Sequence, residues 1–311
     1  MKMDDRLRVF LTVSECRSFS KAAERLPMSQ PAVTQCIKSI ERDLDVQLFD
    51  RSHRTVRLTR AGDIVLAYAE QMDRLDRQMR SVLQEMTTGI SGLFSVGASF
   101  TYGEYVLPRV LAAFRLKHAE VLPSVTIGNS QKVEQLLHDG KLDLGIIEAD
   151  PKLAGLAQYT LFSDRLYVVR SGELDQSRER GHKAHALSEE TWLVREAGSG
   201  TRQVFDAWQS ESLVTPHRLI ELGSTQAIKE GVAAGLGIAI LSELSIQDEL
   251  RQGTFRIADV KGFPRVRNFT MLSAENTFEP MVVKAYRDFT MAWGHPVIHA
   301  LHETSDKEGE V

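Results

Sequence analysis

The sequence has little of what several protein classes require. Its 311 residues include only two cysteines, Cys16 and Cys36, which exclude a disulfide framework and a thiol zinc site. No apolar run reaches the length of about 20 residues that a membrane-spanning helix needs. The N-terminus places Asp4 and Asp5 where a signal peptide would begin its apolar segment. These absences predict a protein of the reducing cytoplasm, with both thiols acting as small core residues.

Catalytic signatures are missing as well. The sequence contains no G-x-S-x-G elbow, no phosphate loop G-x-x-x-x-G-K and no H-E-x-x-H motif. The run Gly198–Gly200 lacks the flanking residues of a nucleophile, and histidines such as His118 and His138 stand alone. We therefore expect no catalytic residue, no metal and no cofactor. A small-molecule-binding α/β protein or an enzyme is the alternative function.

The charges are unevenly distributed along the chain. Residues 1–60 hold 12 Lys and Arg against 8 Asp and Glu, a net charge of +4, whereas residues 61–311 carry −8. A basic N-terminal segment on an acidic remainder favours an anionic partner that binds at one end only. Chance asymmetry is the alternative reading, so the charge supports such a partner without proving it.

The stretch Phe19–Thr59 has the pattern of two short helices, a turn and a basic loop. An amphipathic helix over residues 4–15 precedes it, which makes a unit of three helices. The first short helix is expected over Lys21–Leu26, where the paired alanines allow another helix to pack closely, and Pro27-Met28 forms the turn.

The second short helix is expected to begin at Ser29, whose hydroxyl can cap it, with Pro31 in the first turn, where the missing N–H costs nothing. Its apolar residues recur at helical spacing, at Val33, Ile37, Ile40 and Leu44. The opposite face carries Gln30, Thr34, Gln35 and Lys38, which can donate to phosphates or base edges. A helix of this kind, held across a packed partner, fits a major groove.

A basic hairpin is expected to follow that helix. Residues 47–50 and 55–58 are predicted as short strands around the cationic tip Arg51–Arg54, which forms a wing able to reach a DNA backbone or minor groove. The predicted DNA contacts are Ser29, Gln30, Pro31, Thr34, Gln35, Lys38, Arg51, His53, Arg54 and Arg57. Within this set we expect Gln30 and Gln35 to read bases. A merely solvated polar face is the alternative.

A long helix is predicted after Thr59, which caps it. Its apolar positions alternate at spacings of three and four, at Val65, Tyr68, Met72, Leu75, Met79, Val82 and Met86. Such a heptad seam, with charged residues between its members, predicts helix pairing between two chains. A helix lying on its own domain is the alternative. The helix should end near Thr88, before a hinge at residues 89–92.

Residues 93–302 alternate between strand and helix patterns, which predicts α/β structure with parallel strands. Within it, Ala157–Phe162 and Arg165–Val169 are expected as separate strands. The fold class is therefore mixed: an all-α winged unit, a linker helix and an α/β domain. The predicted boundaries are 1–60, 61–89 and 90–302, with subdomain I at 90–162 and 266–302, subdomain II at 163–265, and a flexible tail at 303–311.

Several blocks of the sequence together resemble the LysR-type transcriptional regulators. The matching runs are FSKAAERL at 19–26, SQPAVT at 29–34, LFDR at 48–51, VRLTRAG at 56–62, DLGI at 143–146, REAGSGTR at 195–202 and VAAGLGIA at 232–239. The resemblance extends over about residues 4–295. The N-terminal runs are highly specific, and the later ones moderately so.

This resemblance implies a winged helix-turn-helix, a dimerising linker helix and an effector domain of two Rossmann-like subdomains, similar to periplasmic binding proteins. The implied partners are double-stranded promoter DNA, a small effector, further copies of the chain in a dimer of dimers (a homotetramer), and RNA polymerase. The chain departs from the family at Pro27 and at Gln35, where many members carry Arg. Because Gln pairs with adenine rather than guanine, we expect a different half-site.

An effector site is expected between the subdomains, where strands end and helices begin. The predicted residues are Ser99, Phe100, Thr101, Asn129, Ser130, Glu148, Ser199, Gly200, Thr201, Arg202 and Thr225. Hydroxyls and N–H groups at positive helix ends suit a small anion. The run GSGTR resembles that of relatives answering to sulfur oxyanions or phosphorylated sugars. A carboxylate at Glu148 favours an amino-acid-like zwitterion instead, and plain helix capping is the third reading.

Overall fold

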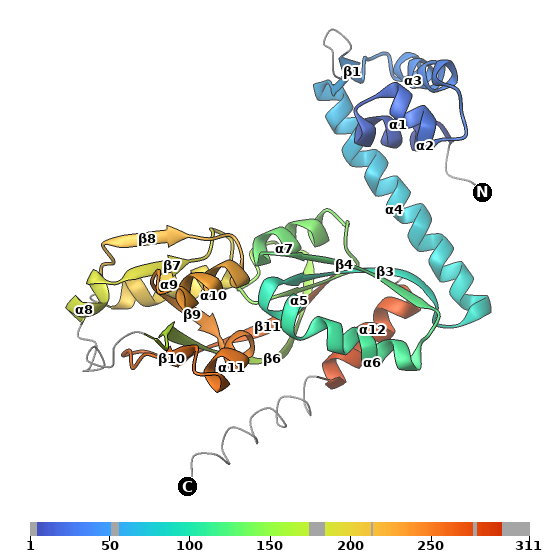
Figure 1. Cartoon of the computed structure of the whole chain (residues 1–311). Helices are drawn as coiled ribbons and strands as arrows, with labels where there is room; N and C mark the ends of the chain where they lie inside the picture. Colours follow the sequence, from blue (N-terminus) through green and yellow to red (C-terminus); the bar gives the residue numbers. More distant parts are fainter. Residues whose placement is uncertain (1–4, 51–55, 174–183, 213, 276–278, 294–311) are drawn as a thin grey trace. The chain divides into compact units, whose positions relative to one another are not determined.

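The computed structural model describes residues 5–50, 56–173, 184–212, 214–275 and 279–293 (Figure 1). The side chains of residue 81 and residues 84–88 also lie outside the described part. The chain divides into two compact units, Met1–Thr87 and Thr88–Val311. Among the described helices, none is both long and apolar enough to cross a membrane.

Three helices begin the first unit: α1 (Asp5–Cys16), α2 (Phe19–Arg25) and α3 (Gln30–Leu44). Ser29 caps α3 by accepting the N–H of Ala32, as the sequence predicted. The second helix starts two residues earlier than expected, because Ser18 accepts the N–H of Lys21 and caps α2. The helices enclose a core that contains Phe10, Val33 and Ile37.

The apolar stripe of α3 is shorter than the sequence indicated. Val33 and Ile37 are buried, whereas Leu44 is 48 % exposed. The difference arises because the helix ends at Leu44, and Asp45 adopts a left-handed conformation with φ of 52°. Glu41 then accepts the N–H groups of Leu48 and Phe49, which fixes the path from α3 to the strands that follow.

Two short strands form the base of the wing, β1 (Phe49–Asp50) and β2 (Arg57–Leu58), and they pair antiparallel. The helix α4 (Arg60–Thr88) follows. Thr59 caps it by accepting the N–H of Gly62 at 3.0 Å. A Cβ at Gly62 would lie 2.1 Å from the carbonyl oxygen of Leu48, so glycine permits α4 to pack directly on the wing.

A nine-stranded sheet forms the second unit, in the order β4-β3-β5-β11-β6-β9-β7-β8, with β10 paired to β6. The strands are β3 (Gly92–Ser99), β4 (Val121–Gly128), β5 (Leu144–Ile147), β6 (Leu156–Ser171), β7 (Thr191–Val194), β8 (Arg218–Glu221), β9 (Ile238–Ser242), β10 (Phe255–Ile257) and β11 (Arg265–Ala274). The triplets β4-β3-β5 and β8-β7-β9 are parallel, as the alternation predicted.

The long strands β6 and β11 join the two halves of this sheet. The sequence suggested two strands over 157–169, but β6 is one strand of 16 residues. It stays continuous because β11 pairs with it from Arg265 to Ala274, past a register shift at Phe269/Thr270. Both strands therefore cross the predicted boundary between the subdomains.

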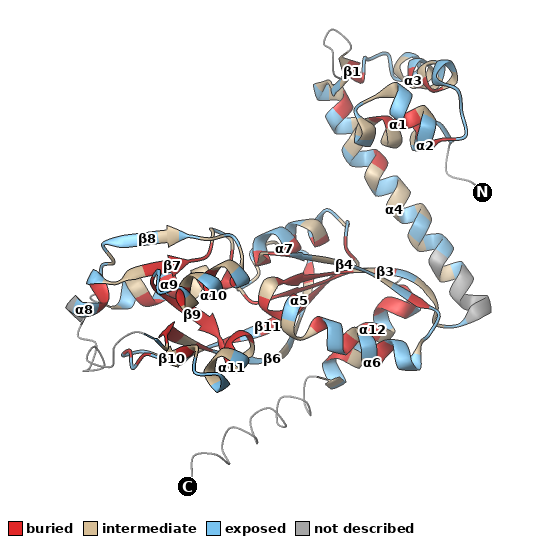
Figure 2. Ribbon diagram, viewed as in Figure 1, coloured by how far each residue is buried: buried red, intermediate tan, exposed pale blue. Residues whose placement is uncertain are grey.

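Helices cover both halves of the sheet (Figure 1). The first half carries α5 (Phe100–Tyr105), α6 (Leu107–Lys117), α7 (Ser130–His138) and α12 (Met281–Trp293). The second half carries α8 (Ala184–Glu189), α9 (Gly200–Glu211), α10 (Thr225–Ala233) and α11 (Glu243–Arg251). Each half has its own apolar cores, one built around Phe114 and Tyr286 and another around Trp192 and Trp208. Figure 2 shows this burial concentrated in the central strands.

Candidate functional sites

The exposed face of α3 carries most of the predicted DNA contacts that the structure describes. Gln30, Pro31, Gln35 and Lys38 are exposed. Thr34 is half-buried, and its hydroxyl donates to the carbonyl of Gln30 at 3.0 Å. The hydroxyl of the exposed Ser29 is used as the helix cap. The polar face is therefore available along the first half of α3.

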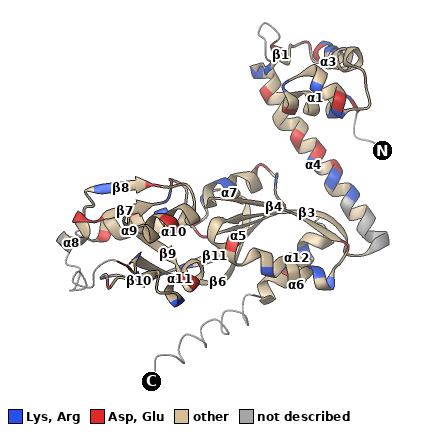
Figure 3. Cartoon of the chain, viewed as in Figure 1, with Lys and Arg blue, Asp and Glu red and all other residues tan. Residues whose placement is uncertain are grey.

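The wing is described only in part. Arg57 is exposed on β2 and lies opposite Asp50 in the strand pair. Arg51, His53 and Arg54 lie outside the described residues. Figure 3 shows acidic and basic residues interspersed along α4. Charge alone therefore does not single out one face of this helix.

An exposed apolar stripe runs along α4. Its members are 39 % to 62 % exposed: Ile64, Tyr68, Met72, Leu75, Met79 and Leu83. Four of them belong to the predicted seam, but Val65 packs against the core of its own unit and Val82 is half-buried. The side chain of Met86 lies outside the described part of the chain. Ile64 thus takes the position expected of Val65, and the stripe faces away from the core.

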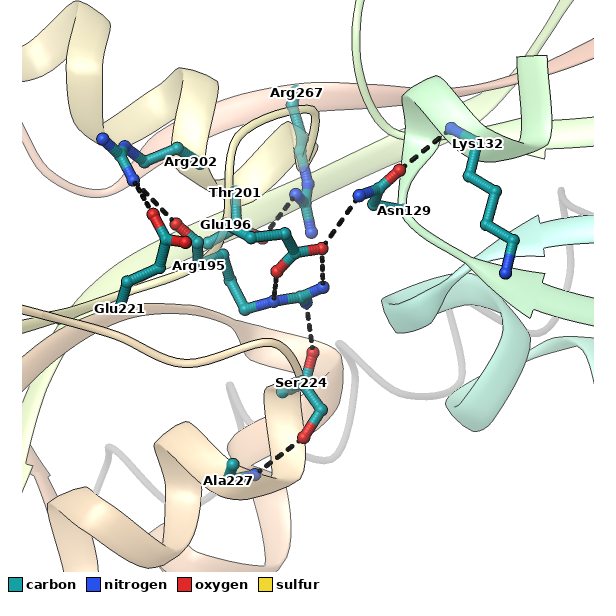
Figure 4. A network of polar contacts seen from close by, with 11 residues as sticks. Asn129, Lys132, Arg195, Glu196, Thr201, Arg202, Glu221, Ser224, Ala227 and Arg267 are labelled. Carbon is teal, nitrogen blue, oxygen red and sulfur yellow. Dashed lines mark hydrogen bonds and ion pairs between the residues drawn. The ribbon is translucent and has the colours of Figure 1, made fainter. Parts of the chain in front are cut away.

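Arg267 on β11 is the centre of a buried polar cluster where the two halves of the sheet meet. Its Nη1 donates to Oγ1 of Thr201 at 3.0 Å (Figure 4), and its Nη2 donates to Oγ1 of Thr101 at 3.1 Å. Asp164 on β6 accepts from Nε at 2.9 Å, and Oε2 of Glu148 lies 3.3 Å from Nη2. We call these five residues the Arg267 cluster.

The cluster holds two carboxylates against one cation. Ser242 donates to Oδ1 of Asp164 at 2.7 Å, so both oxygens of this carboxylate are bonded. Burial is the main cause that raises the pKa of Asp164 above its ordinary value, and Arg267 opposes that shift. With both carboxylates ionised, the formal charge of the cluster would be −1. Desolvation explains why Asp164 binds its proton more tightly than an exposed aspartate.

Three of the predicted site residues have a buried polar atom without a hydrogen-bond partner among the described residues: Oγ of Ser99, Oγ of Ser199 and Oε2 of Glu148. Ser99 and Ser199 occupy the N-cap positions of α5 and α9, yet neither side chain caps its helix. By contrast, Asn129 and Ser224 cap α7 and α10 through their side chains. The capping interpretation therefore applies to the latter pair and not to the two buried serines.

A second polar group lies beside the cluster, around Arg195 at the end of β7. Its Nε donates to Oε2 of Glu196 at 2.8 Å and its Nη1 donates to Thr225 at 3.1 Å. Glu196 also accepts from Asn129 at 3.0 Å, and hydrogen bonds lower the pKa of Glu196 despite partial burial. The ring of Phe100 covers the guanidinium at 4.4 Å from centroid to Cζ. Residues of both halves therefore meet here.

Not every predicted residue reaches this region. Ser130 accepts the N–H of Glu148 at 3.3 Å, and Gly200 lies against Glu148. Arg202, however, pairs with Asp206 at 2.8 Å and with Glu221 at 3.1 Å, and its Nη1 donates to the carbonyl of Arg195 at 2.9 Å. Figure 4 draws the pair with Glu221. The cation that contacts the hydroxyls is Arg267 instead.

Sequence reasoning missed Arg267, Asp164, Arg195 and Glu196. Arg267 stands in the strand pattern RVRNFTML, where it shares a sheet face with Phe269 and Met271. A charge on the buried face of a strand was the signal that could have found it, because such a charge requires a partner. Arg195 and Glu196 stood inside a recognised motif but carried no assigned role.

Comparisons with known proteins agree with this architecture. Residues 87–294 match the model of the LysR substrate binding domain, and residues 5–63 match that of the bacterial regulatory helix-turn-helix protein, lysR family. The chain belongs to the LysR family. This LysR-family chain is 30 % identical over 276 residues to the HTH-type transcriptional regulator CysL of Bacillus subtilis (strain 168). The aligned residues cover 88 % of this chain and 92 % of CysL.

Solved LysR-family structures share the fold. Full-length CbnR complexed with its target DNA superposes with a TM-score of 0.70 at 21 % identity, over 93 % of this chain and 99 % of CbnR. The regulatory domain of CcmR from Synechocystis PCC6803, in complex with 2-PG, has a TM-score of 0.61 at 25 % identity, over 66 % of this chain and 99 % of that domain. This LysR-family chain is a DNA-binding transcriptional regulator with an effector-binding domain, and not an enzyme.

Proposed function

We propose that this regulator responds to a small anion held at the Arg267 cluster, between the two halves of its C-terminal unit. The observation that carries the proposal is the guanidinium of Arg267, which donates to Thr101 of one half and to Thr201 of the other. Because both hydroxyls accept from Arg267, their own protons are free to be donated to a ligand. Ser99 and Ser199 add two buried hydroxyls that have no described partner.

The proposed effector is an oxygen-rich anion, either a sulfur oxyanion or a phosphorylated metabolite. Hydroxyl donors beside the first turns of helices suit such a ligand. The 2-PG complex of the related CcmR domain supports the phosphorylated class. An amino-acid-like zwitterion is the alternative, and the specific observation in its favour is the buried carboxylate of Glu148. We assign contact roles to Ser99, Thr101, Ser130, Ser199 and Thr201.

For the DNA, we propose that α3 enters a major groove and that the wing contacts the backbone. Gln30 and Gln35 are the proposed base readers, and Lys38 and Arg57 the proposed phosphate contacts. The exposed stripe on α4 supports pairing of two chains, so that two copies of α3 would bind half-sites about one helical turn apart. We further propose that the protein assembles as a dimer of dimers. It would act in the cytoplasm and contact RNA polymerase.

The DNA proposal is tested by a fluorescence-anisotropy titration of the DNA just upstream of the gene, at several salt concentrations. We expect Lys38→Ala to weaken binding to all sequences and to reduce the magnitude of the salt slope by about 1 per DNA-bound chain, because one phosphate contact is lost. Lys117→Ala, on the C-terminal unit, serves as the matched control and should leave the slope unchanged. A wild-type slope for Lys38→Ala would refute the phosphate contact.

A further inference from the structure

The charges around the proposed effector site do not suit a ligand that only accepts hydrogen bonds. In the Arg267 cluster, one guanidinium faces two carboxylates, and all three side chains are at most 6 % exposed. The neighbouring pairs Arg195–Glu196 and Lys229–Glu249 each add no net charge. An anion bound there meets a surface whose fixed charge is not positive.

The two carboxylates of the cluster differ in their hydrogen bonds. Asp164 accepts from Arg267 and from Ser242, so its oxygens are occupied. Oε2 of Glu148 is buried and accepts no hydrogen bond from any described group, although it lies 3.3 Å from Nη2 of Arg267. A buried carboxylate oxygen without a donor is costly, so this atom is available to a donor supplied from outside the chain.

Glu148 also lies where it can reach a ligand held by both halves of the unit. It follows β5 of the first half, and its N–H donates to Ser130 of the same half. Against it lies Gly200, the first residue of α9 in the second half, where a Cβ would come within 2.7 Å of Cγ of Glu148. Glu148 therefore lies against the first residue of α9, directly after Ser199 in the chain.

We infer that the effector is an anion that also carries an O–H or N–H donor, and that Glu148 is the residue that recognises this donor. The inference rests on the proposed anion site at the Arg267 cluster and narrows its ligand class. The hydroxyls and Arg267 bind the anionic group, while Oε2 of Glu148 accepts the ligand's proton donor. Hydrogen phosphate, a hydroxy acid and an amino acid each carry both an anionic group and a proton donor.

Anions without a donor are rejected by the same carboxylate. Sulfate offers only acceptor oxygens, so it would face Oε2 of Glu148 across a desolvated contact between like charges. A buried polar group left unpaired by the wrong ligand gives stronger discrimination than an apolar pocket can achieve. Among sulfur oxyanions, only a protonated form fits this site.

The test uses the full-length chain and isothermal titration calorimetry with pairs of probes matched in size. Inorganic phosphate is compared with sulfate, and glycolate and glycine are compared with acetate. We expect the probe that carries a donor to bind at least about tenfold more tightly than its partner. Tighter binding of glycine than of glycolate would identify an ammonium as the donor. Tighter binding of glycolate would identify a hydroxyl.

The variant Glu148→Gln tests the assigned residue. The amide has nearly the same shape but offers N–H donors, so sulfate should bind the variant more tightly than it binds the wild type, and phosphate more weakly. Glu104→Gln is the matched control, because it removes an exposed carboxylate on α5 whose charge interacts with that of Glu148. The control variant should bind the probes in the same order of affinity as the wild type.

The outcomes distinguish the donor requirement at Glu148 from the proposed anion site at the Arg267 cluster. Equal binding of sulfate and phosphate by the wild type, or an unchanged order in Glu148→Gln, would overturn the donor requirement while keeping the anion site. Binding of no probe by either protein would overturn both the inference and the anion site. Preference for the donor in the wild type, together with its reversal in Glu148→Gln, supports the role of Glu148.

Discussion

At the scale of single residues, Arg267 is the contact point between two halves of a unit that are far apart in sequence. Its hydrogen bond to Asp164 spans 103 positions and that to Thr101 spans 166. The side chains involved are nearly all buried, so their desolvation is already complete in the folded chain. Removing one charged partner from such a buried network is strongly destabilising when it leaves another charge buried without its counter-charge.

Removing the cation should therefore destabilise the C-terminal unit strongly. Arg267→Met leaves Asp164 and Glu148 buried without their counter-charge, a loss of about 3–5 kcal/mol. For a unit of this size the melting temperature should fall by on the order of 10 °C in differential scanning calorimetry. Arg202→Met breaks two ion pairs whose carboxylates are more than half exposed, each of which should contribute only about 0–1 kcal/mol. Similar melting temperatures for the two variants would refute the central role of Arg267.

The pH dependence of stability reports on Asp164. Burial raises its pKa above the ordinary value of 3.8, so the stability that its proton contributes is complete below pH 3.8 and is lost as the pH rises through the raised pKa. The variant Asp164→Asn cannot lose this contribution. We expect the stability of the wild type relative to the variant to decrease as the pH is raised from 3.8, measured as melting temperature over a pH series.

The exposed pair between Arg202 and Asp206 provides the control for that series. Asp206→Asn removes an aspartate that is half-exposed and lies outside the Arg267 cluster. Its difference from the wild type should not follow the pattern of Asp164→Asn. A difference between wild type and Asp164→Asn that stays constant over the same pH range would contradict the buried-proton account.

At the scale of elements, sequence patterns predicted helices and caps well where the signals are local. Ser29 and Thr59 cap α3 and α4 as expected, because an N-cap depends on the next three residues. The strand β6 was divided in two because its continuity depends on pairing with β11, about 100 residues later. The predicted seam on α4 begins at Val65, whereas the exposed stripe begins at Ile64. Only the folded structure shows that Val65 packs against the core of its own unit.

The same distinction explains the effector region. Ser99, Thr101, Ser199 and Thr201 could be predicted, because hydroxyls at helix starts are visible in the sequence. Arg267 could not be assigned to them, since its partners come from three other elements and no local pattern connects them. The sequence thus locates the hydroxyls at the helix starts, and tertiary pairing brings the charge of Arg267 to Thr101 and Thr201.

The stripe on α4 leads to a prediction about assembly. Leu75 is 62 % exposed at the middle of the stripe, and burying it against a second copy would remove apolar surface from water. We expect Leu75→Glu to shift the protein toward monomers in sedimentation velocity, because a carboxylate would then lie in the seam. Gln71→Glu, which adds the same charge at an exposed polar position, is the control. An unchanged oligomeric state in Leu75→Glu would argue against pairing through α4.

At the scale of the whole molecule, two units carry two kinds of recognition. The first unit presents the polar face of α3, and the second encloses buried hydroxyls and charges around Arg267. Residues 88–311 carry 23 Lys and Arg against 29 Asp and Glu, a net charge of −6, which opposes non-specific attachment of the second unit to DNA. A signal must therefore pass from the effector site to the N-terminal unit as a change in how the DNA is bound.

The central claim is that a ligand at the Arg267 cluster alters the binding of α3 to promoter DNA. DNase I footprinting of the DNA upstream of the gene, with and without an anion that calorimetry shows to bind, tests this directly. The wild-type footprint should change on adding the anion, and the footprint of Thr201→Val should not, because one hydroxyl of the cluster is lost. An unchanged wild-type footprint at saturating anion, or the same change in Thr201→Val, would contradict the account.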